Sequence, residues 1–519
     1  MFNPSKPNII ILTDFTNTLF LERVLGATKV ADSLRQAGYE VLVVNHLHTF
    51  SIDEIKEILT HTINQNTLFV GINSIFYQSI NSTNKVSSGG SWEQGGIVFG
   101  DRDLGAFLPH GKQFNKPIKE LVKSINPNCK FVLGGPDAID RDWNSDYDYV
   151  ILGLADLSAV NLARHLETGV KLEKSRRSLY KFTVIDDAKA LDYDFTGTQM
   201  YYSNLDIVLP GETLPIEIGR GCIFNCKFCS YPLNGKKKND YVKCEDVLYS
   251  ELLDNYEKFG TTRYIFTDDT FNDTKEKLEV IYKISKKLPF KLEYWSTARL
   301  DLLTAHPETV ELLYGSGCRA SYFGVESLNR SSAAAIGKGG SRENLIKTIK
   351  RIKDMYGDSV ALHGSFIFGL PKEDKDSLKK TSEQLLSGET YLDSWGAQAL
   401  MLRPASGLAF SSELDRNYEK YGYRVIGYDK ENDFLIWEND YTDFNECREL
   451  TNELHRKGTE QGRIAVRGDD SFYISTFGFD LDYSLNKPIR DFDWHSVELK
   501  KRDYIVDYKR KLFQMIGMI

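Results

Sequence analysis

The sequence lacks the features that mark several large classes of protein. No apolar run approaches the roughly 20 residues of a membrane-spanning helix, and the first residues show no basic leader followed by a small-residue cleavage site. Seven cysteines, an odd number in a long chain, do not indicate a disulfide framework. The formal net charge of -8 gives no general attraction to phosphate, so a nucleic-acid partner would need a local basic surface. We therefore expect a cytoplasmic protein with reduced cysteines and no membrane contact.

The length and composition predict more than one globular domain. A chain of 519 residues exceeds what a single hydrophobic core supports. Hydrophobic residues make up 41% and charged residues 27%, enough apolar side chains to bury cores and enough charge for solubility. We expect about two to four domains built from ordinary secondary structure.

Strand-length apolar runs alternate with amphipathic helices in the N-terminal part, which we place at 1–170. Strands are expected at 8–13, 40–45, 68–72, 130–133 and 149–152, and helices at 52–62 and 118–125. This alternation predicts a Rossmann-like α/β domain, in which a parallel sheet is covered on both faces. A Gly-rich stretch at 81–115 follows the third strand and is either a lid or a passive loop.

A second alternation follows a linker at 171–205. Its strands are expected at 214–218, 264–267, 292–296, 320–325, 363–368 and 397–402. Six such units predict a partial (β/α)6 barrel of the TIM type at 206–410, with catalytic groups at the carboxyl ends of the strands. Residues 411–519 are rich in aromatic and charged side chains and contain one clear helix at 444–461. We expect them to form a small α+β C-terminal domain that caps the barrel or binds substrate.

Three cysteines, Cys222, Cys226 and Cys229, have a CxxxCxxC spacing directly after the first strand of the second alternation. Three thiolates this close can bind three corners of a 4Fe-4S cluster, and they leave the fourth iron without a protein ligand. That open iron can chelate the amino and carboxylate groups of a methionine moiety. We therefore interpret the three cysteines as metal ligands and as the catalytic centre. The alternative is a structural zinc site, for which Cys244 would have to be the fourth ligand.

The cysteine loop and the strand ends that follow it resemble the radical S-adenosylmethionine superfamily. The CxxxCxxC loop with the aromatic Phe228 before its last cysteine is similar to that family's signature. Further segments resemble the strand-end motifs of the subclass that carries an N-terminal cobalamin-binding domain, namely 266–271, 295–301, 317–327 and 368–371. The resemblance covers 206–405. It implies that S-adenosylmethionine is cleaved reductively to a 5'-deoxyadenosyl radical.

The resemblance also implies that polar groups at the strand ends hold the cofactor. Arg299 is expected to bind the methionine carboxylate of S-adenosylmethionine, and Glu326 with Ser327 its amino or ribose groups. From the residue type alone, Arg299 could equally form a salt bridge at the barrel rim, because partly exposed arginines commonly do so.

Four more residues are candidates for cofactor binding on the same face. Phe228 is expected to pack against the adenine, and Gly369 to let the backbone approach it. Asp268 and Asp269 follow the second barrel strand and are either ligands of substrate or cofactor or caps of the next helix.

The N-terminal domain resembles the cobalamin-binding fold in three segments, 24–41, 131–136 and 149–153. Gly134 and Gly135 end a strand where the nucleotide tail or ring edge of a corrin could pass closely. The sequence departs from the fold's pattern because Asp14 is not followed by the histidine that supplies a lower cobalt ligand. His46 and His48 follow the second strand and are either substitutes for it or ordinary rim or core histidines. Bound cobalamin is expected, and the alternative is a relic domain that binds substrate.

These parts together predict a radical enzyme, most simply a cobalamin-dependent C-methyltransferase. A radical rearrangement or oxidative cyclisation without methyl transfer is the alternative reaction, and a cluster-bearing sensor is the non-enzymatic one. The expected partners are a reductant such as flavodoxin or ferredoxin and a small-molecule or modified-nucleotide substrate. Basic runs at 236–238, 500–502 and 509–511 leave a phosphate-bearing or nucleic-acid substrate open. Methylthiolation fits poorly, because the first domain contains one cysteine, Cys129, rather than three more cluster ligands.

Overall fold

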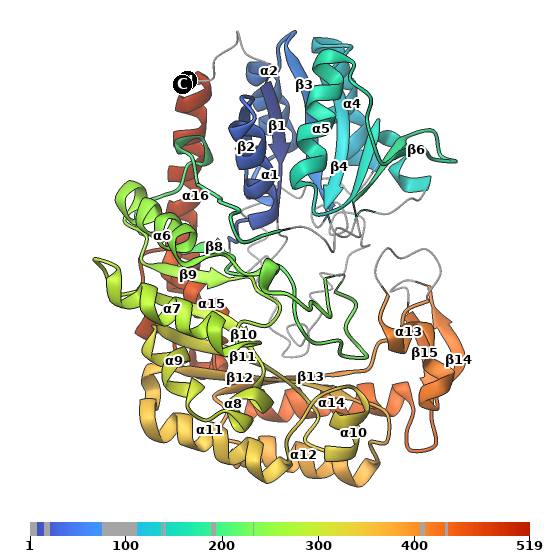
Figure 1. Ribbon diagram of the computed structural model, residues 1–519, viewed down its shortest axis with the longest axis vertical. Coiled ribbons are helices and arrows are strands. Elements are labelled where there is room, and N and C mark those ends of the chain that lie inside the picture. Colours follow the sequence, from blue (N-terminus) through green and yellow to red (C-terminus); the bar gives the residue numbers. More distant parts are fainter. Residues whose placement is uncertain are drawn as a thin grey trace.

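The protein is described here from a computed structural model, which covers residues 8–14, 21–74, 112–135, 138, 142–187, 194–231, 233–404, 411–430 and 434–519. Within these residues the chain forms two large sheets, one above the other in Figure 1, with helices on their faces. No helix among the described residues is long and apolar enough to cross a membrane.

The first sheet has the strand order β2-β1-β3-β4-β5-β7-β6 in the described part of the chain. All neighbouring pairs are parallel except β6 with β7. The strands are β1 (Asn8–Leu12), β2 (Glu40–Val44), β3 (Thr67–Asn73), β4 (Lys130–Gly135), β5 (Tyr149–Gly153), β6 (Ser175–Arg177) and β7 (Thr183–Asp187). The predicted Rossmann-like domain is confirmed. Because β6 and β7 lie within 171–205, this part of the expected linker belongs to the sheet.

Helices cover both faces of the first sheet, which explains why its strands are apolar at successive positions. The helices are α1 (Leu25–Gln36), α2 (Ile52–Thr62), α4 (Lys112–Ile125) and α5 (Asp156–Thr168). In β1, Ile10 packs into one core with residues of α2 and α4, and Ile11 packs into another with residues of α1 and α5. The stretch predicted as a lid or loop, 81–115, lies outside the described residues except for its end, which begins α4.

The second sheet consists of parallel strands in sequence order, β8 to β13, and forms the predicted partial barrel. Its strands are β8 (Leu214–Ile216), β9 (Arg263–Phe266), β10 (Glu293–Ala298), β11 (Cys318–Glu326), β12 (Ala361–Phe368) and β13 (Ser394–Ala399). Its helices are α6 (Glu245–Phe259), α7 (Lys275–Lys287), α8 (Leu300–Ala305), α9 (Thr309–Gly315), α10 (Arg330–Ala335), α11 (Arg342–Tyr356) and α12 (Lys375–Ser387). The prediction of a strand at 397–402 was three residues late, because β13 pairs with β12 from Ser394 onwards.

The C-terminal residues pack on both sheets rather than on one of them. Their elements are α13 (Glu413–Arg416), the antiparallel hairpin of β14 (Arg424–Asp429) and β15 (Phe434–Glu438), α14 (Phe444–Glu460), α15 (Gly468–Thr476) and α16 (Trp494–Ile516). Helix α14 packs on β13 through Gly458, which lies against Trp395. Gly468, at the start of α15, lies against Ala320 and Trp295 in the early parts of β11 and β10.

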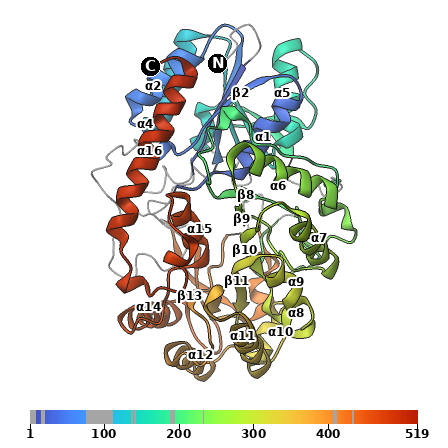
Figure 2. The same cartoon turned by 90° about the vertical axis from the view of Figure 1, so that its left-hand side faces the viewer.

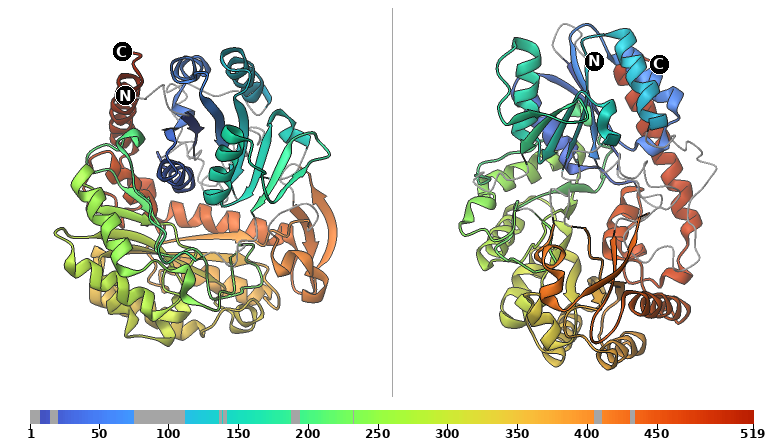
Figure 3. Two further views of the ribbon diagram at one scale, coloured as in Figure 1. Left: turned by 45° about the horizontal axis from the view of Figure 1, so that its top comes forward. Right: turned by 90° about the vertical axis from the view of Figure 1, so that its right-hand side faces the viewer.

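Helix α16 runs from the barrel to the first sheet (Figures 2 and 3). There the amide of Asn45 donates to the Tyr508 hydroxyl at 2.9 Å, and Lys509 pairs with Glu54 on α2 at 3.0 Å. The last helix therefore connects the two large domains along one side of the molecule.

Candidate active site

The cysteine loop leaves the carboxyl end of β8 and is held there by a buried carboxylate. Asp268, at the end of β9, accepts hydrogen bonds from the amides of Ile218 at 3.0 Å and Gly219 at 2.6 Å. Lys277 on α7, also buried, lies 3.0 Å from the same carboxylate. Asp268 was expected to be a ligand or a helix cap. Its carboxylate instead holds the loop in place, and the cap of α7 is Thr274.

The three cysteines are free thiols that differ in exposure, Cys222 being buried and the other two half-buried. Two of the sulfur atoms receive hydrogen bonds, one from Asn234 Nδ2 to Cys229 at 3.1 Å and one from Arg299 Nη1 to Cys226 at 3.3 Å. Burial raises the pKa of the Cys222 and Cys229 thiols. A thiolate here therefore needs a cation beside it, and iron supplies such a charge. The donor set fits a cluster with one cysteine on each of three irons.

The zinc alternative gains no support from the geometry. Cys244 is the exposed N-cap residue of α6. In the described part of the chain, no group of three or more His, Cys, Asp or Glu side chains is arranged around one point where a single metal ion could sit. A cubane cluster does not require such convergence, because each cysteine binds a different iron.

Arg299 forms a salt bridge at the barrel rim and also contacts the cysteine loop. Its guanidinium makes a two-pronged contact with Asp301, at 3.0 and 2.6 Å, and donates to the Gly337 carbonyl at 3.1 Å. The ring of Phe224, in the loop between the cysteines, lies 4.0 Å from the guanidinium carbon. The structure thus contains the rim salt bridge and adds a hydrogen bond from the guanidinium to the Cys226 sulfur.

Glu326 and Ser327 lie together at the end of β11 beside a lysine that the sequence did not indicate. Glu326 has φ 64°, in the left-handed region, and its carboxylate is 3.6 Å from Lys338 Nζ. Burial raises the pKa of Glu326, and Lys338 opposes this. The Ser327 hydroxyl donates to Glu373. Such a strained, buried cluster at a strand end is typical of ligand-binding sites.

The remaining barrel candidates differ in what surrounds them. A Cβ on Gly369 would lie 2.3 Å from the Trp437 ring, so this glycine is needed for packing against the hairpin, not for an approach to adenine. Phe228 is half-buried, with its ring centroid 5.9 Å from Lys338 Nζ. Asp269 keeps solvent access and is hydrogen-bonded to Tyr231, but desolvation raises its pKa.

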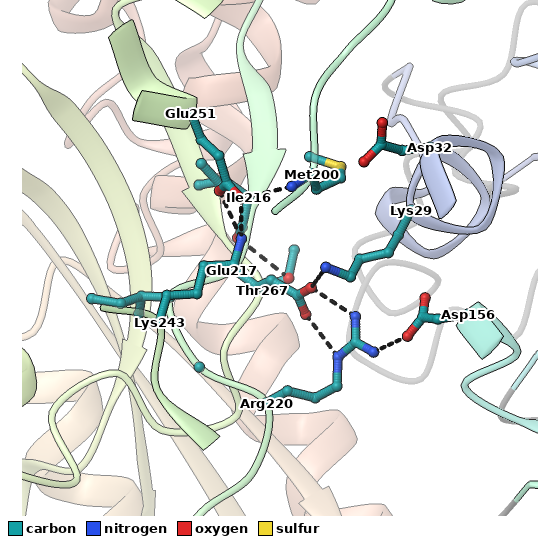
Figure 4. Close-up of polar contacts among 12 residues, drawn as sticks. Lys29, Asp32, Asp156, Met200, Ile216, Glu217, Arg220, Lys243, Glu251 and Thr267 are labelled. Carbon is teal, nitrogen blue, oxygen red and sulfur yellow. Dashed lines mark hydrogen bonds and ion pairs between the residues drawn. The ribbon is translucent and has the colours of Figure 1, made fainter. Parts of the chain in front are cut away.

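An ionic network joins the cysteine loop to the N-terminal domain (Figure 4). Glu217, at the start of the loop, contacts Arg220 at 2.7 Å and Lys29 on α1 at 3.3 Å. Arg220 also pairs with Asp156, the first residue of α5. The charged ends of Lys29 and Arg220 each lie 5.0 Å from the centroid of the Phe195 ring. Although burial alone would raise it, the surrounding cations hold the pKa of Glu217 at about 2.

A second buried pair lies next to this network but within one domain. Lys243 Nζ is 2.8 and 2.7 Å from the carboxylate oxygens of Glu251 on α6, and the Met200 amide donates to the same carboxylate at 2.7 Å (Figure 4). Burial raises the pKa of Glu251 in spite of Lys243. Nearby cations thus outweigh the effect of burial on the pKa of Glu217 but not on the pKa of Glu251.

The carboxyl ends of β1, β2 and β3 carry a chain of polar contacts. Asp14, just after β1, is hydrogen-bonded to the side chain of Asn73 at the end of β3, at 3.2 Å in each direction. Its carboxylate accepts from the His48 amide at 2.6 Å and is 2.8 Å from His48 Nδ1. In open sheets of the order 2-1-3-4-5, ligands bind at the switch point between β1 and β3. The Asp14 and His48 pair therefore lies beside the expected ligand site.

The two glycines expected to approach a corrin lie at the end of β4, next to β3 and β5. Gly135 has φ 126°, a backbone conformation that favours glycine, and a Cβ there would lie 2.5 Å from the Ser74 Oγ. A Cβ on Gly134 would make ordinary contact with Ile151 at 3.8 Å. Both lie at the carboxyl edge of the sheet, the same edge from which Asp156 reaches the cysteine loop.

Sequence reasoning missed several residues of this site. Lys277, Lys338 and Asn234 carry no motif, and a lysine in a helical pattern predicts a solvated face. Glu217 and Arg220 stand beside the cysteines in the sequence, and that proximity was the available signal. Their partners Lys29 and Asp156 come from another domain and carry no signal in the sequence.

Comparisons with known proteins agree with this geometry. Residues 216–385 match the family model of the radical SAM superfamily. An uncharacterized methyltransferase of Pyrococcus horikoshii is 26% identical over 284 residues, 51% of this chain and 59% of the relative. A bacteriochlorophyllide d C-8(2)-methyltransferase of Chlorobaculum tepidum is 26% identical over 164 residues, 30% of this chain and 35% of that protein. The chain thus spans less than two thirds of the length of either curated relative.

Two solved structures have a similar overall fold. The radical S-adenosylmethionine methyltransferase TsrM from Kitasatospora setae, with cobalamin and a [4Fe-4S] cluster bound, matches with a TM-score of 0.63 at 12% identity, over 97% of this chain and 99% of that chain. The cobalamin-dependent S-adenosylmethionine radical enzyme OxsB, with aqua-cobalamin and S-adenosylmethionine bound, matches with a TM-score of 0.59 at 13% identity, over 99% and 83%. At such low identity the likeness establishes the arrangement of the domains and not the activity.

Proposed function

We propose that the protein is a cobalamin-dependent C-methyltransferase, on the premise that residues 216–385, which match the family model of the radical SAM superfamily, act as a radical S-adenosylmethionine domain. The observation that carries the proposal is the position of the cysteine loop. The loop that carries the three free thiols begins at the carboxyl end of β8. Arg220 on the same loop pairs with Asp156 at the carboxyl edge of the first sheet. A cluster site on one domain thus faces the ligand-binding edge of the other.

The side chains of this chain would hold and shield the cluster. When bound by Cys222, Cys226 and Cys229, a 4Fe-4S cluster supplies one electron and an open iron for S-adenosylmethionine, whose cleavage yields a 5'-deoxyadenosyl radical. Arg299 and Asn234 donate N–H groups to two of the sulfur atoms and so help to hold them in place. The Asp268 anchor keeps the loop in one conformation.

The strand-end groups would orient the cosubstrate. We assign the methionine carboxylate to Arg299, which would give up part of its contact with Asp301, and the methionine amino group to Glu326, whose carboxylate has Lys338 as its near partner. Ser327 would contact the ribose from a position fixed by Glu373. The contact between Arg220 and Asp156 places the first sheet beside the loop, which would help to keep bulk solvent away from the reacting groups.

The carboxyl edge of the first sheet is the proposed cobalamin site. The edge carries the switch point between β1 and β3 and the glycine pair at the end of β4. When bound there, cobalamin supplies a methyl group for transfer. Residues 134–135 and the polar contacts around Asp14 would hold it, and the barrel would present the substrate from the opposite side.

The proposal extends to partners and location. We propose a small molecule as substrate, an electron donor of the flavodoxin or ferredoxin class, and a cytoplasmic protein. All seven cysteines are free thiols, as a reducing compartment would keep them.

The test is anaerobic reconstitution with iron and sulfide, followed by S-adenosylmethionine and a reductant. We expect a cluster with broad absorption near 400 nm, release of 5'-deoxyadenosine, and corrinoid absorption after addition of cobalamin. The triple variant Cys222→Ala, Cys226→Ala, Cys229→Ala should lose the cluster and the product. Cys244→Ala, which removes an exposed thiol outside the loop, should keep both. Equal 5'-deoxyadenosine formation by the two variants would contradict the cluster assignment.

A further inference from the structure

We propose that His48 is the lower axial ligand of the cobalt in bound cobalamin. The inference deepens the proposed function and depends on its cobalamin part. No histidine follows Asp14 within the same loop, but the structure brings one beside it from the loop after β2. The Asp and His pair expected of a single segment is thus assembled from two segments that are 34 residues apart.

The position of His48 is that of a ligand-binding residue. It lies in the turn that follows β2, and its partner Asp14 follows the neighbouring strand β1. Asn73, at the end of β3 on the other side of β1, completes a row of three side chains along the carboxyl edge. That row includes the switch point, because α1 and α4, which come after β1 and β3, lie on opposite faces of the sheet. Ligands of open α/β sheets bind at such points.

The hydrogen bonding of His48 fixes which nitrogen is available. Nδ1 lies 2.9 and 2.8 Å from the two oxygens of Asp14, whose side chain is fully buried. With Nδ1 facing this carboxylate, Nε2 is the ring nitrogen left to bind a metal. A quarter of the His48 side chain stays accessible, and among the described residues no hydrogen bond engages Nε2. An imidazole whose other nitrogen donates to a carboxylate is the common arrangement of a metal ligand.

His46, two residues earlier, differs in each of these respects. It is 1% exposed, and neither of its ring nitrogens has a hydrogen-bond partner among the described residues. Its ring makes edge contacts with Tyr504 and Tyr508 on α16. The His46 ring is thus enclosed by its packing on α16 and is not accessible to a metal. Of the two histidines that the sequence left open, the structure assigns the ligand role to His48.

The chemistry needs no additional reactant. With cobalamin bound at this edge, Nε2 of His48 would donate an electron pair to the cobalt. The oxidation state of cobalt does not change in this step. Asp14 supports the bond by keeping Nδ1–H hydrogen-bonded, which makes Nε2 a better electron donor.

The experiment is electron paramagnetic resonance of the bound cob(II)alamin in protein grown with either natural or 15N-labelled histidine. A nitrogen ligand splits each cobalt line into a triplet when it is 14N and into a doublet when it is 15N. We expect a triplet in unlabelled protein and a doublet in labelled protein. The base of cobalamin itself contains only 14N here, so a triplet that persists in labelled protein would mean that this base, and not a histidine, binds cobalt, which would overturn the proposal.

Variants then identify the histidine. His48→Gly should lose the splitting, and added 15N-imidazole should restore a doublet by filling the vacated space. His61→Ala, which removes an exposed imidazole on α2, should leave the labelled doublet unchanged. A doublet that survives in labelled His48→Gly without imidazole would overturn the assignment, because another histidine would be the ligand.

The failure of this inference is distinguishable from the failure of the proposed function. Corrin bound without nitrogen splitting in unlabelled wild-type protein refutes the His48 ligand and leaves the cobalamin site standing. Absence of corrin absorption after gel filtration refutes both.

Discussion

The ionic network between the cysteine loop and the N-terminal domain predicts a specific loss of stability when Glu217 is neutralised. In Glu217→Gln, the amide replaces the charge that Arg220 and Lys29 both contact. Two buried cations then lose the partner that compensates their desolvation. Removal of one member of a buried ion pair costs about 3 to 5 kcal/mol.

The pKa of Glu217 gives a second, independent magnitude for this loss of stability. The network holds it at about 2, against an ordinary value of 4.5. At 1.36 kcal/mol for each pKa unit, this difference corresponds to about 3 kcal/mol of stabilisation at pH 7. The two figures agree, so we expect Glu217→Gln to lower the free energy of unfolding by about 3 kcal/mol.

The sign of the pH dependence follows from the depressed pKa. A carboxyl group with a low folded-state pKa stabilises the fold above its unfolded-state pKa and loses this effect as the pH falls through the folded-state value. The difference in stability between wild type and Glu217→Gln should therefore shrink to about half of its neutral value near pH 3. Urea unfolding followed by tryptophan fluorescence, at pH 7 and at several lower pH values, measures it.

Glu453→Gln is the control. Glu453 also pairs with a lysine, Lys457 at 2.7 Å, but both side chains lie on the surface of α14 and are about half exposed. Water solvates Lys457 when the carboxylate is neutralised, so Glu453→Gln should destabilise far less at pH 7. If Glu217→Gln and Glu453→Gln lose equal stability at pH 7, the reasoning from the network is refuted.

Three other perturbations test separate contacts. Asp268→Asn should lower the iron content after reconstitution, because an amide cannot both accept from the loop amides and neutralise Lys277. An unchanged iron content would mean that the loop keeps its conformation without Asp268. Gly468→Ala should cost about 1 to 3 kcal/mol in urea unfolding, since its Cβ would lie 2.3 Å from the Ala320 methyl, whereas Gly197→Ala, with no atom within 4 Å, should be nearly neutral. Tyr508→Phe leaves the buried Asn45 amide without its acceptor and should lower the free energy of unfolding by about 1 to 3 kcal/mol. No change in stability would mean that a water molecule replaces the hydroxyl.

Much of the fold could be predicted from the sequence because both large domains alternate strand and helix. The helix predicted at 52–62 has those bounds in the structure, and the strands of both sheets were found within a few residues, apart from the late start of β13. Strands β6 and β7 were missed. Strand β6 is short, exposed and at the edge of the sheet, whereas β7 lies between β5 and β6. The buried apolar residues of β7 are Val184 and Ile185, too few in a row for the apolar run of a typical buried strand.

The site was predictable only where its residues are local in sequence. The cysteine loop carries its own spacing, and Arg299 was recognisable from its motif. Asp268 was correctly placed at the strand end, but its role was not, because the direction of a side chain at a strand end depends on the loop that packs on it. Gly369 was expected to face a ligand and instead accommodates Trp437 of the hairpin, some 70 residues later in the chain.

The sequence by itself determined the two alternating domains, the three sulfur ligands and their placement after a barrel strand. These depend on periodicity and spacing along the chain, which short-range geometry turns directly into structure. The tertiary structure alone decided which histidine meets Asp14, which cations surround Glu217, and that α16 connects the two domains. Such contacts join residues far apart in sequence, so no pattern along the chain records them, and only the packing of one domain on the other brings their charges and lone pairs together.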